Sequence, residues 1–364
     1  MSAMTFIYLI AGLIMLVGGA ELLVRGAAKL AAQFGISPLI IGLTVVAFGT
    51  SAPETAVSVK ASFDGSGDIA VGNVLGSNIA NVLLILGVTA LVAPLVVSRQ
   101  LIRLDVPIMI GASLVTYGLA WDGSLSRLDG ALLFGAVVCY TAFLIVSSRR
   151  ATAAAAAEQD EFAREFGLDQ PSKPHASLIN AALVIAGLVL LVAGSHFLVE
   201  GAVSLAKALG LSELVIGLTV IAVGTSLPEL ATSTMAAIRG ERDIAVGNIV
   251  GSNIFNLLCV LGLASLVSPN AIPVAANALA FDFPVMIAVA LACLPIFFSG
   301  YNVNRWEGLL FLAYYVAYTA YLILASNGRA FAETFGDAVL VYAAPLTAIT
   351  LLVIAGRAWK LQRN

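Results

Sequence analysis

Runs of about 20 apolar residues recur along the whole chain, and each is long enough to cross a bilayer as an α-helix. Of the 364 residues, 60% are hydrophobic and only 11% are charged, whereas soluble domains carry about 25% charged residues. The chain is therefore predicted to be an all-α integral membrane protein. We predict eleven transmembrane helices, near residues 4–24, 37–61, 70–92, 104–121, 126–147, 178–199, 212–237, 244–267, 277–298, 305–325 and 336–356.

An internal repeat constrains the arrangement of these helices. Residues 42–87 align without a gap with residues 217–262, and 28 of the 46 aligned positions are identical. Each copy lies in a group of five predicted helices. Because five is an odd number, the second group enters the membrane from the opposite side, and such inverted repeats are typical of secondary transporters. Channels can share this architecture.

We therefore predict a ten-helix core made of two inverted five-helix repeats, with an extra eleventh transmembrane helix at the C-terminal end. The first repeat spans residues 1–148 and the second spans residues 177–326. A charged linker with two prolines, residues 149–176, joins them in water. Residues 327–364 hold the additional helix and a polar tail.

The distribution of Lys and Arg predicts the orientation, since cytoplasmic loops of membrane proteins carry an excess of both. With the N-terminus outside, 14 of the 18 Lys and Arg residues fall on the cytoplasmic side. The exceptions are Lys60, Arg127, Lys207 and Arg329. We expect a multi-pass protein of the cell (inner) membrane, with the linker and the C-terminus in the cytoplasm. The lipid bilayer is its surrounding, and a net charge of −3 gives no reason to expect a nucleic-acid partner.

Each copy of the repeat places a glutamate, Glu54 or Glu229, inside an apolar run. A carboxylate at the bilayer centre costs about 3 kcal/mol or more, so such residues are rarely accidental. A buried ion pair would be the bland explanation, but no Lys or Arg lies within the apolar parts of the neighbouring spans. A bound cation or a proton is therefore the expected partner.

The residues around each glutamate favour a cation. Because positions i and i+4 share a helix face, a threonine and a serine are expected beside each carboxylate. A proline one residue before the glutamate frees main-chain carbonyls near Gly49 and Gly224 and should break the span into two half-helices. Hydroxyl, carbonyl and carboxylate oxygens suit Na+ or Ca2+. These neighbours are Thr50, Ser51 and Pro53 in the first copy, and Thr225, Ser226 and Pro228 in the second.

A second motif, "GNVLGSNIAN" and later "GNIVGSNIFN", puts a polar stripe on the next helix of each repeat. The stripe comprises Asn73, Ser77 and Asn81 in the first copy, and Asn248, Ser252 and Asn256 in the second. Hydrogen bonding between helices is one explanation of these residues, and it is the favoured one for Asn73, Asn78, Asn248 and Asn253. Ion binding is favoured for the other four.

With both motifs in view, the chain resembles the cation/Ca2+ antiporter superfamily, and especially its prokaryotic sodium/calcium exchangers. The paired "GTSxPE" and "GSNIxN" segments are similar to that family's two α-repeats. The resemblance implies that the first and sixth helices form a long tilted pair. It also implies ion ligands from side chains and from the main-chain carbonyls of two alanines. In this sequence the implied ligands are Ala47, Thr50, Ser51, Glu54, Ser77, Asn81, Ala222, Thr225, Ser226, Glu229, Ser252 and Asn256.

The resemblance implies Na+-driven Ca2+ exchange by alternating access, in which both ions compete for the same two glutamates. Exchange of protons for Ca2+ or another divalent cation is the alternative, because a buried carboxylate can also carry a proton near neutral pH. The resemblance implies Na+ and Ca2+ as the substrates, and no cofactor is expected. Some relatives carry Asp linked to K+ at one paired position, whereas Asn81 and Asn256 are both Asn. We expect no enzyme, since no membrane-embedded His or Lys is placed to activate Ser51.

Overall fold

The computed structural model describes residues 3–34, 36–166, 176–208 and 222–326, together with residues 345, 347, 349, 353 and 356. Within this part of the chain, eight helices are long and apolar enough to cross a membrane, or nine if one bent pair counts as a single span. The predicted span 212–237 is described only from Ala222 onward, and the predicted eleventh span, 336–356, lies outside the described residues apart from single positions. The protein is thus a multi-pass helical membrane protein.

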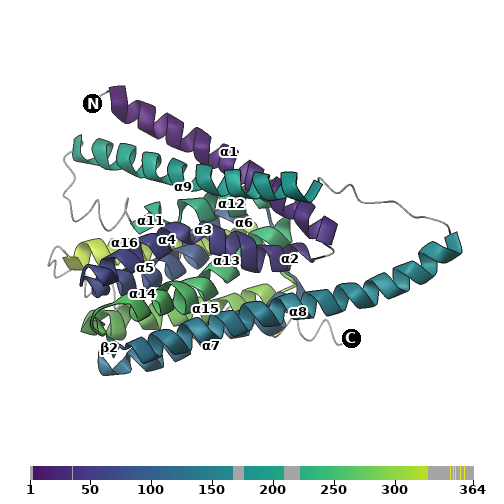
Figure 1. Ribbon diagram of the computed structural model, residues 1–364. Helices are drawn as coiled ribbons and strands as arrows, with labels where there is room; N and C mark the ends of the chain where they lie inside the picture. The colour runs from purple at the N-terminus through teal and green to yellow at the C-terminus, as the bar shows by residue number, and fades with distance from the viewer. Residues whose placement is uncertain are drawn as a thin grey trace.

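Within the described residues, both halves of the chain are built of helices (Figure 1). The first half contains α1 (Ala3–Phe34), α2 (Pro38–Ile41), α3 (Ala47–Thr50), α4 (Ala52–Phe63), α5 (Gly67–Ala80), α6 (Gly87–Val92), α7 (Val106–Leu119) and α8 (Arg127–Phe166). The second half contains α9 (Ala176–Ala208), α11 (Ala222–Gly224), α12 (Leu227–Ile238), α13 (Arg242–Phe255), α14 (Leu261–Val267), α15 (Phe283–Phe298) and α16 (Arg305–Ser326). Short π-helical segments join several of these, including Asn81–Leu86 and Asn256–Val260.

The predicted break in the second span is present. The helical segment Pro38–Thr50, which ends with α3, meets α4 at Ser51 and is bent by 46° with respect to it. In the second half, α11 ends at Gly224 and α12 begins at Leu227. The carbonyl of Gly224, freed from the helix ladder, accepts a hydrogen bond from the Ser195 hydroxyl of α9 at 2.6 Å. Proline at the start of α4 and of α12 explains both interruptions, because it cannot donate to the preceding turn.

Helices α1 and α9 lie side by side across one face of the other helices (Figure 1). They run antiparallel, because residues late in α1 face residues early in α9. A Cβ added to Gly19 would lie 2.8 Å from the carbonyl oxygen of Gly187, and one added to Gly12 would lie 2.8 Å from that of Gly194. Small residues at these positions let the two backbones approach closely. The antiparallel pair supports the predicted opposite orientation of the two halves.

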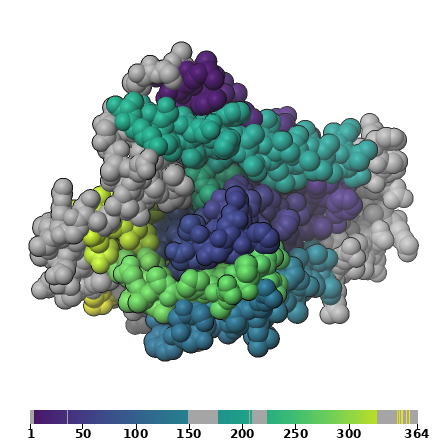
Figure 2. Space-filling model, turned by 60° about the vertical axis from the view of Figure 1, so that its left-hand side comes forward, coloured from purple at the N-terminus to yellow at the C-terminus, as the bar shows by residue number. Residues whose placement is uncertain are grey.

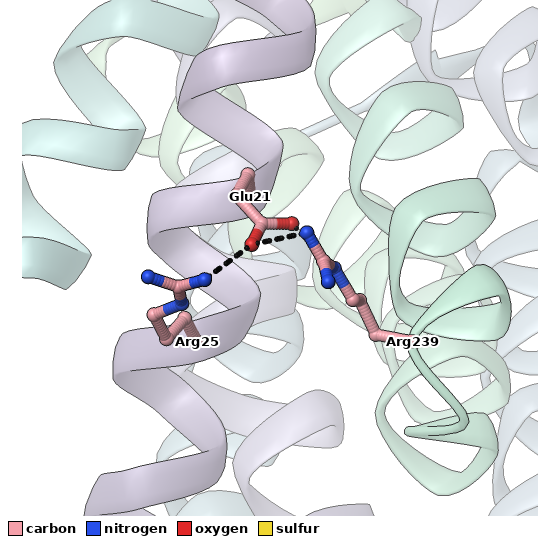
Figure 3. Close-up of polar contacts among 3 residues, drawn as sticks. All are labelled: Glu21, Arg25 and Arg239. Atoms are coloured by element: carbon pink, nitrogen blue, oxygen red, sulfur yellow. Dashed lines mark hydrogen bonds and ion pairs between the residues drawn. The ribbon is translucent and has the colours of Figure 1, made fainter.

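Both helices of this pair are longer than predicted: α1 continues to Phe34 and α9 to Ala208. Polar and charged residues ended the predicted spans there, but the helices extend through them. Figure 3 shows one charged cluster near the predicted end of the first span, where Glu21 of α1 contacts Arg25 one turn later and Arg239 at the end of α12. Helix α8 likewise runs past its predicted span into the linker and ends at Phe166.

Two short strand pairs were not predicted, and each joins the two halves. Strand β1 (Leu95–Val96) pairs antiparallel with β4 (Asn302–Val303), and β2 (Ser124–Leu125) pairs with β3 (Ile272–Pro273). Two residues are too few to produce a recognisable alternating pattern. Each pair links a loop of the first half to a loop of the second half through antiparallel strand pairing.

The helices that carry the second motif are the most enclosed ones. In the spans Gly67–Val92 and Arg242–Val267, 78% and 89% of an apolar stretch of 18 residues is buried inside the protein. The buried share of such a stretch is only 11–44% in the other six spans. Figure 2 shows the blue helices around α4 between the teal α9 above and green helices of the second half below. The centre of the molecule is therefore formed by the repeated segments.

Candidate cation site

The two glutamates lie at the centre of the molecule, each in the first turn of the helix that follows a broken span. Glu54 belongs to α4 and Glu229 to α12, and their exposed fractions are 0% and 1%. Helices α5 and α13 pack against α4 and α12 respectively. The two repeated motifs of each half are thus brought together, as their positions in the sequence suggested.

Each carboxylate is held by a serine of the opposite repeat. Ser226 donates to Oε1 of Glu54 at 3.0 Å, and Ser51 donates to Oε1 of Glu229 at 3.1 Å. The sequence had suggested that Ser51 lies beside Glu54, three residues later, and did not predict this bond across the repeats. Ser51 is the N-cap residue of α4, where the helix is interrupted with a ψ of 12°, and its hydroxyl bonds to the glutamate of the opposite repeat.

Six further oxygens of the predicted ligands are buried and unsatisfied. Ten buried side-chain oxygens or nitrogens have no hydrogen-bond partner in the described part of the chain, and six of them belong to predicted ligands. These six form three pairs related by the repeat: Oε2 of Glu54 and Glu229, Oγ of Ser77 and Ser252, and Oδ1 of Asn81 and Asn256. Buried polar atoms are normally hydrogen-bonded. A symmetric cluster of unsatisfied oxygens is the arrangement expected of a cation site.

The threonines also bond across the repeats. Thr50 donates to Oδ1 of Asn248 at 3.1 Å, and Thr225 donates to Oδ1 of Asn73 at 3.5 Å. The amide nitrogen of Asn248 in turn donates to Ser233 of α12 at 2.9 Å. Asn248 and Asn73 therefore accept from the hydroxyls of these threonines and bond helices together, as expected for a structural role. Thr50 and Thr225 remain predicted ligands.

The main-chain carbonyls that the resemblance implied are located at the broken spans. The carbonyl of Ala47 accepts from the Ser51 amide at 3.1 Å and from the Thr50 hydroxyl at 3.4 Å. Ala222 is the first residue of α11, at the equivalent place in the second half. The role of Ala47 and Ala222 as ligands stays a prediction.

Neither glutamate has a basic partner among the residues that the structure describes. Lys60 pairs with Asp64 at 2.7 Å, and Arg239 pairs with Glu21 at 2.6 Å. Within the same residues, no three His, Cys, Asp or Glu side chains come together. The donor set is thus two carboxylates surrounded by neutral oxygens, and such hard ligands suit Na+ or Ca2+ better than a transition metal.

Sequence reasoning missed one candidate in this region. Thr232 lies one turn after Glu229 in α12, is fully buried, and has an Oγ1 without a hydrogen-bond partner among the described residues. Comparison of the repeats could not find it, because the equivalent residue is Val57, which is 40% exposed. Its spacing of three residues from the glutamate is the signal that would have found it.

Comparison with known proteins places this geometry in a family. The family model described as sodium/calcium exchanger protein matches residues 4–146 and 179–324. The putative antiporter CaxA of Alkalimonas amylolytica is 41% identical over 323 residues, which are 88% of this chain and 98% of that protein. The sodium/calcium exchanger MaX1 of Methanosarcina acetivorans is 34% identical, over 88% of this chain and 99% of its own.

A solved structure agrees with these sequence relationships. The sodium-calcium exchanger NCX_Mj, soaked with zero Na+ and Ca2+, superposes with a TM-score of 0.74 and 30% sequence identity. The match covers 88% of this chain and 100% of that one. The repeats, the buried glutamates and these relatives lead to one conclusion: this chain belongs to the sodium/calcium exchanger family.

Proposed function

We propose that this protein is a secondary antiporter that exchanges Na+ for Ca2+ through one central site. The observation that carries the proposal is the symmetric set of six buried oxygens without partners, which includes one oxygen of each glutamate. Burying an unpaired charge costs far more than burying a hydrogen-bonded polar group. Two buried carboxylates without a basic neighbour among the described residues therefore require cations, and a single Ca2+ balances both charges.

The same charges explain why exchange would be obligatory. Glu54 and Glu229 are the two acidic groups of the site, and a Ca2+ that contacts both leaves no uncompensated charge for Na+. Na+ bound to the same carboxylates excludes Ca2+ in turn. The names of the relatives, sodium/calcium exchanger and antiporter, support this assignment. The positions Ala47, Thr50, Ser51, Ser77 and Asn81, with their counterparts in the second repeat, complete the proposed ligand set.

Exchange of protons for Ca2+ is the second candidate, supported by the same glutamates. A buried carboxylate that loses its cation can be neutralised by a proton instead. Ser51 and Ser226 each leave one carboxylate oxygen without a partner, and that oxygen can take either a proton or a cation. Geometry alone is compatible with both coupling ions.

The deciding experiment is uptake of radioactive Ca2+ into proteoliposomes that contain the full-length protein. Vesicles loaded with Na+ are compared with vesicles loaded with K+ or choline, and with vesicles under an imposed pH gradient. Uptake that requires internal Na+ and disappears in Glu54→Gln and Glu229→Gln supports the proposal. Uptake that follows the pH gradient instead would replace Na+ by H+ as the coupling ion, and no uptake under either gradient would overturn Ca2+ as the substrate.

A further inference from the structure

Two asparagines outside the proposed ligand set lie directly against it. Asn78 on α5 and Asn253 on α13 are 1% and 2% exposed, and each precedes a proposed ligand, Asn81 or Asn256, by three residues. Three residues are almost one helical turn, so each lies beside the ligand of its own helix. Their hydrogen bonds, however, go to the ligand of the opposite repeat.

Two matching hydrogen bonds between side-chain amides cross from one repeat to the other. Asn81 donates its amide nitrogen to Oδ1 of Asn253 at 2.9 Å, and Asn256 donates to Oδ1 of Asn78 at 3.1 Å. The amide nitrogen of each proposed ligand is thus directed away from the unsatisfied oxygens. The Oδ1 atoms of Asn81 and Asn256 are buried and have no hydrogen-bond partner among the residues that the structure describes.

Atoms that can only accept determine which way these amides face. Asn78 donates its amide nitrogen to the main-chain carbonyl of Asn253 at 3.2 Å, and a carbonyl cannot donate. The Oδ1 of Asn78 must therefore face Asn256. On the other side, the amide nitrogen of Asn253 donates to the thioether sulfur of Met109 at 3.4 Å, which is likewise only an acceptor.

We infer that Asn78 and Asn253 are positioning residues that turn the amide oxygens of Asn256 and Asn81 toward the transported cation. An asparagine can present either an oxygen or an NH2 group, and only the oxygen binds a cation. Partners of this kind, which orient a ligand without touching the ion, commonly change metal affinity about 10- to 100-fold when removed. The inference rests on the proposed function. It explains how the two ligand asparagines present oxygen atoms, and not NH2 groups, to the ion.

A double-mutant cycle separates orientation from packing. Asn253→Leu keeps the size of the side chain but removes the acceptor for Asn81. Asn81→Asp replaces the amide with a carboxylate, which presents an oxygen whichever way it turns. If Asn253 orients Asn81, its loss weakens Ca2+ binding about tenfold or more in the parent protein, and much less in a protein that already carries Asn81→Asp.

The measurement is equilibrium binding of radioactive Ca2+ to the purified full-length protein, with the fold checked by gel filtration and thermal unfolding. An equal loss in the parent and in the Asn81→Asp background would mean that Asn253 only fills space, and would overturn the inference. The mirrored cycle, Asn78→Leu with Asn256→Asp, gives an independent test if Asn253→Leu does not fold. A parent protein that binds neither Ca2+ nor Na+ would overturn the proposed function itself, and this result is visible before any variant is compared.

Discussion

Thr50 donates its hydroxyl to Oδ1 of Asn248 over 3.1 Å, so a residue at the broken span of one repeat is bonded to the enclosed helix of the other. Asn248 is completely buried and also donates to Ser233. The bond therefore joins α3, α13 and α12 at the edge of the proposed cation site.

Replacing Thr50 by Val is expected to destabilise the protein by about 1–3 kcal/mol, because the substitution leaves Oδ1 of Asn248 buried without a donor. The matched control is Thr50→Ser, which keeps the hydroxyl and should retain most of the stability. Thermal unfolding in detergent, followed by a fluorescent probe, measures both. Equal unfolding temperatures for the Val and Ser variants would contradict the assignment of this hydrogen bond.

Removing the serine hydroxyls should weaken cation binding symmetrically. Each variant removes a proposed ligand oxygen together with the hydrogen bond that positions a carboxylate, so Ser51→Ala and Ser226→Ala are each expected to lower Ca2+ affinity by about tenfold or more. Equilibrium binding of radioactive Ca2+ provides the measurement. Ser265→Ala is the control, since its buried hydroxyl donates to the Leu261 carbonyl of its own helix. A loss in only one of the two site variants would argue against equal use of both carboxylates.

Adjacent glycines in α1 should respond in opposite ways to the same substitution. An added Cβ at Gly19 would lie 2.8 Å from a main-chain oxygen and 2.9 Å from a main-chain nitrogen of α9, whereas one at Gly18 meets nothing within 4 Å. Gly19→Ala is expected to cost about 1–3 kcal/mol through overpacking. Gly18→Ala should be neutral or stabilising by up to about 1 kcal/mol. Thermal unfolding of the two variants checks this, and similar values would mean that α1 and α9 pack less closely than described.

The ion pair between Glu21 and Arg239 is expected to contribute little to stability. Its two contacts are short, 2.6 and 2.7 Å, but the Arg239 side chain is 54% exposed. Exposed pairs typically contribute about 0.2–1 kcal/mol and weaken as salt rises. Arg239→Ala should therefore lower the unfolding temperature slightly at low salt and not at high salt. A large, salt-independent loss would show that Arg239 has another structural role.

Much of the geometry of the candidate site could be predicted because both repeats carry the same two motifs. The glutamates, the broken helix at Ser51 and the burial of Ser77 and Asn81 all follow from apolar context, proline chemistry and the repeat. Apart from α1, α8 and α9, which continue past their predicted ends, the described spans agree closely with the predicted ones, since apolar length is a strong signal. The comparisons also support the family resemblance, which rested on the two repeated motifs.

What the sequence could not predict depends on contacts between the halves. Helical spacing relates Ser51 to Glu54, but it could not predict that the Ser51 hydroxyl donates to Glu229 of the other repeat. The amide exchange of Asn78 and Asn253 required the packing of α5 near α13, which no local pattern encodes. The two-residue strands were missed because they are too short to show a period.

The crossed serine–glutamate bonds have a consequence for how such a chain could arise and assemble. Each carboxylate takes its hydroxyl from the other repeat, so a single repeat contains a glutamate without its partner. A protein of half this length would obtain a complete pair only by associating with a second copy in the antiparallel sense that α1 and α9 display. Two separately expressed halves of the present chain should likewise regain a site only when both are inserted in the same membrane.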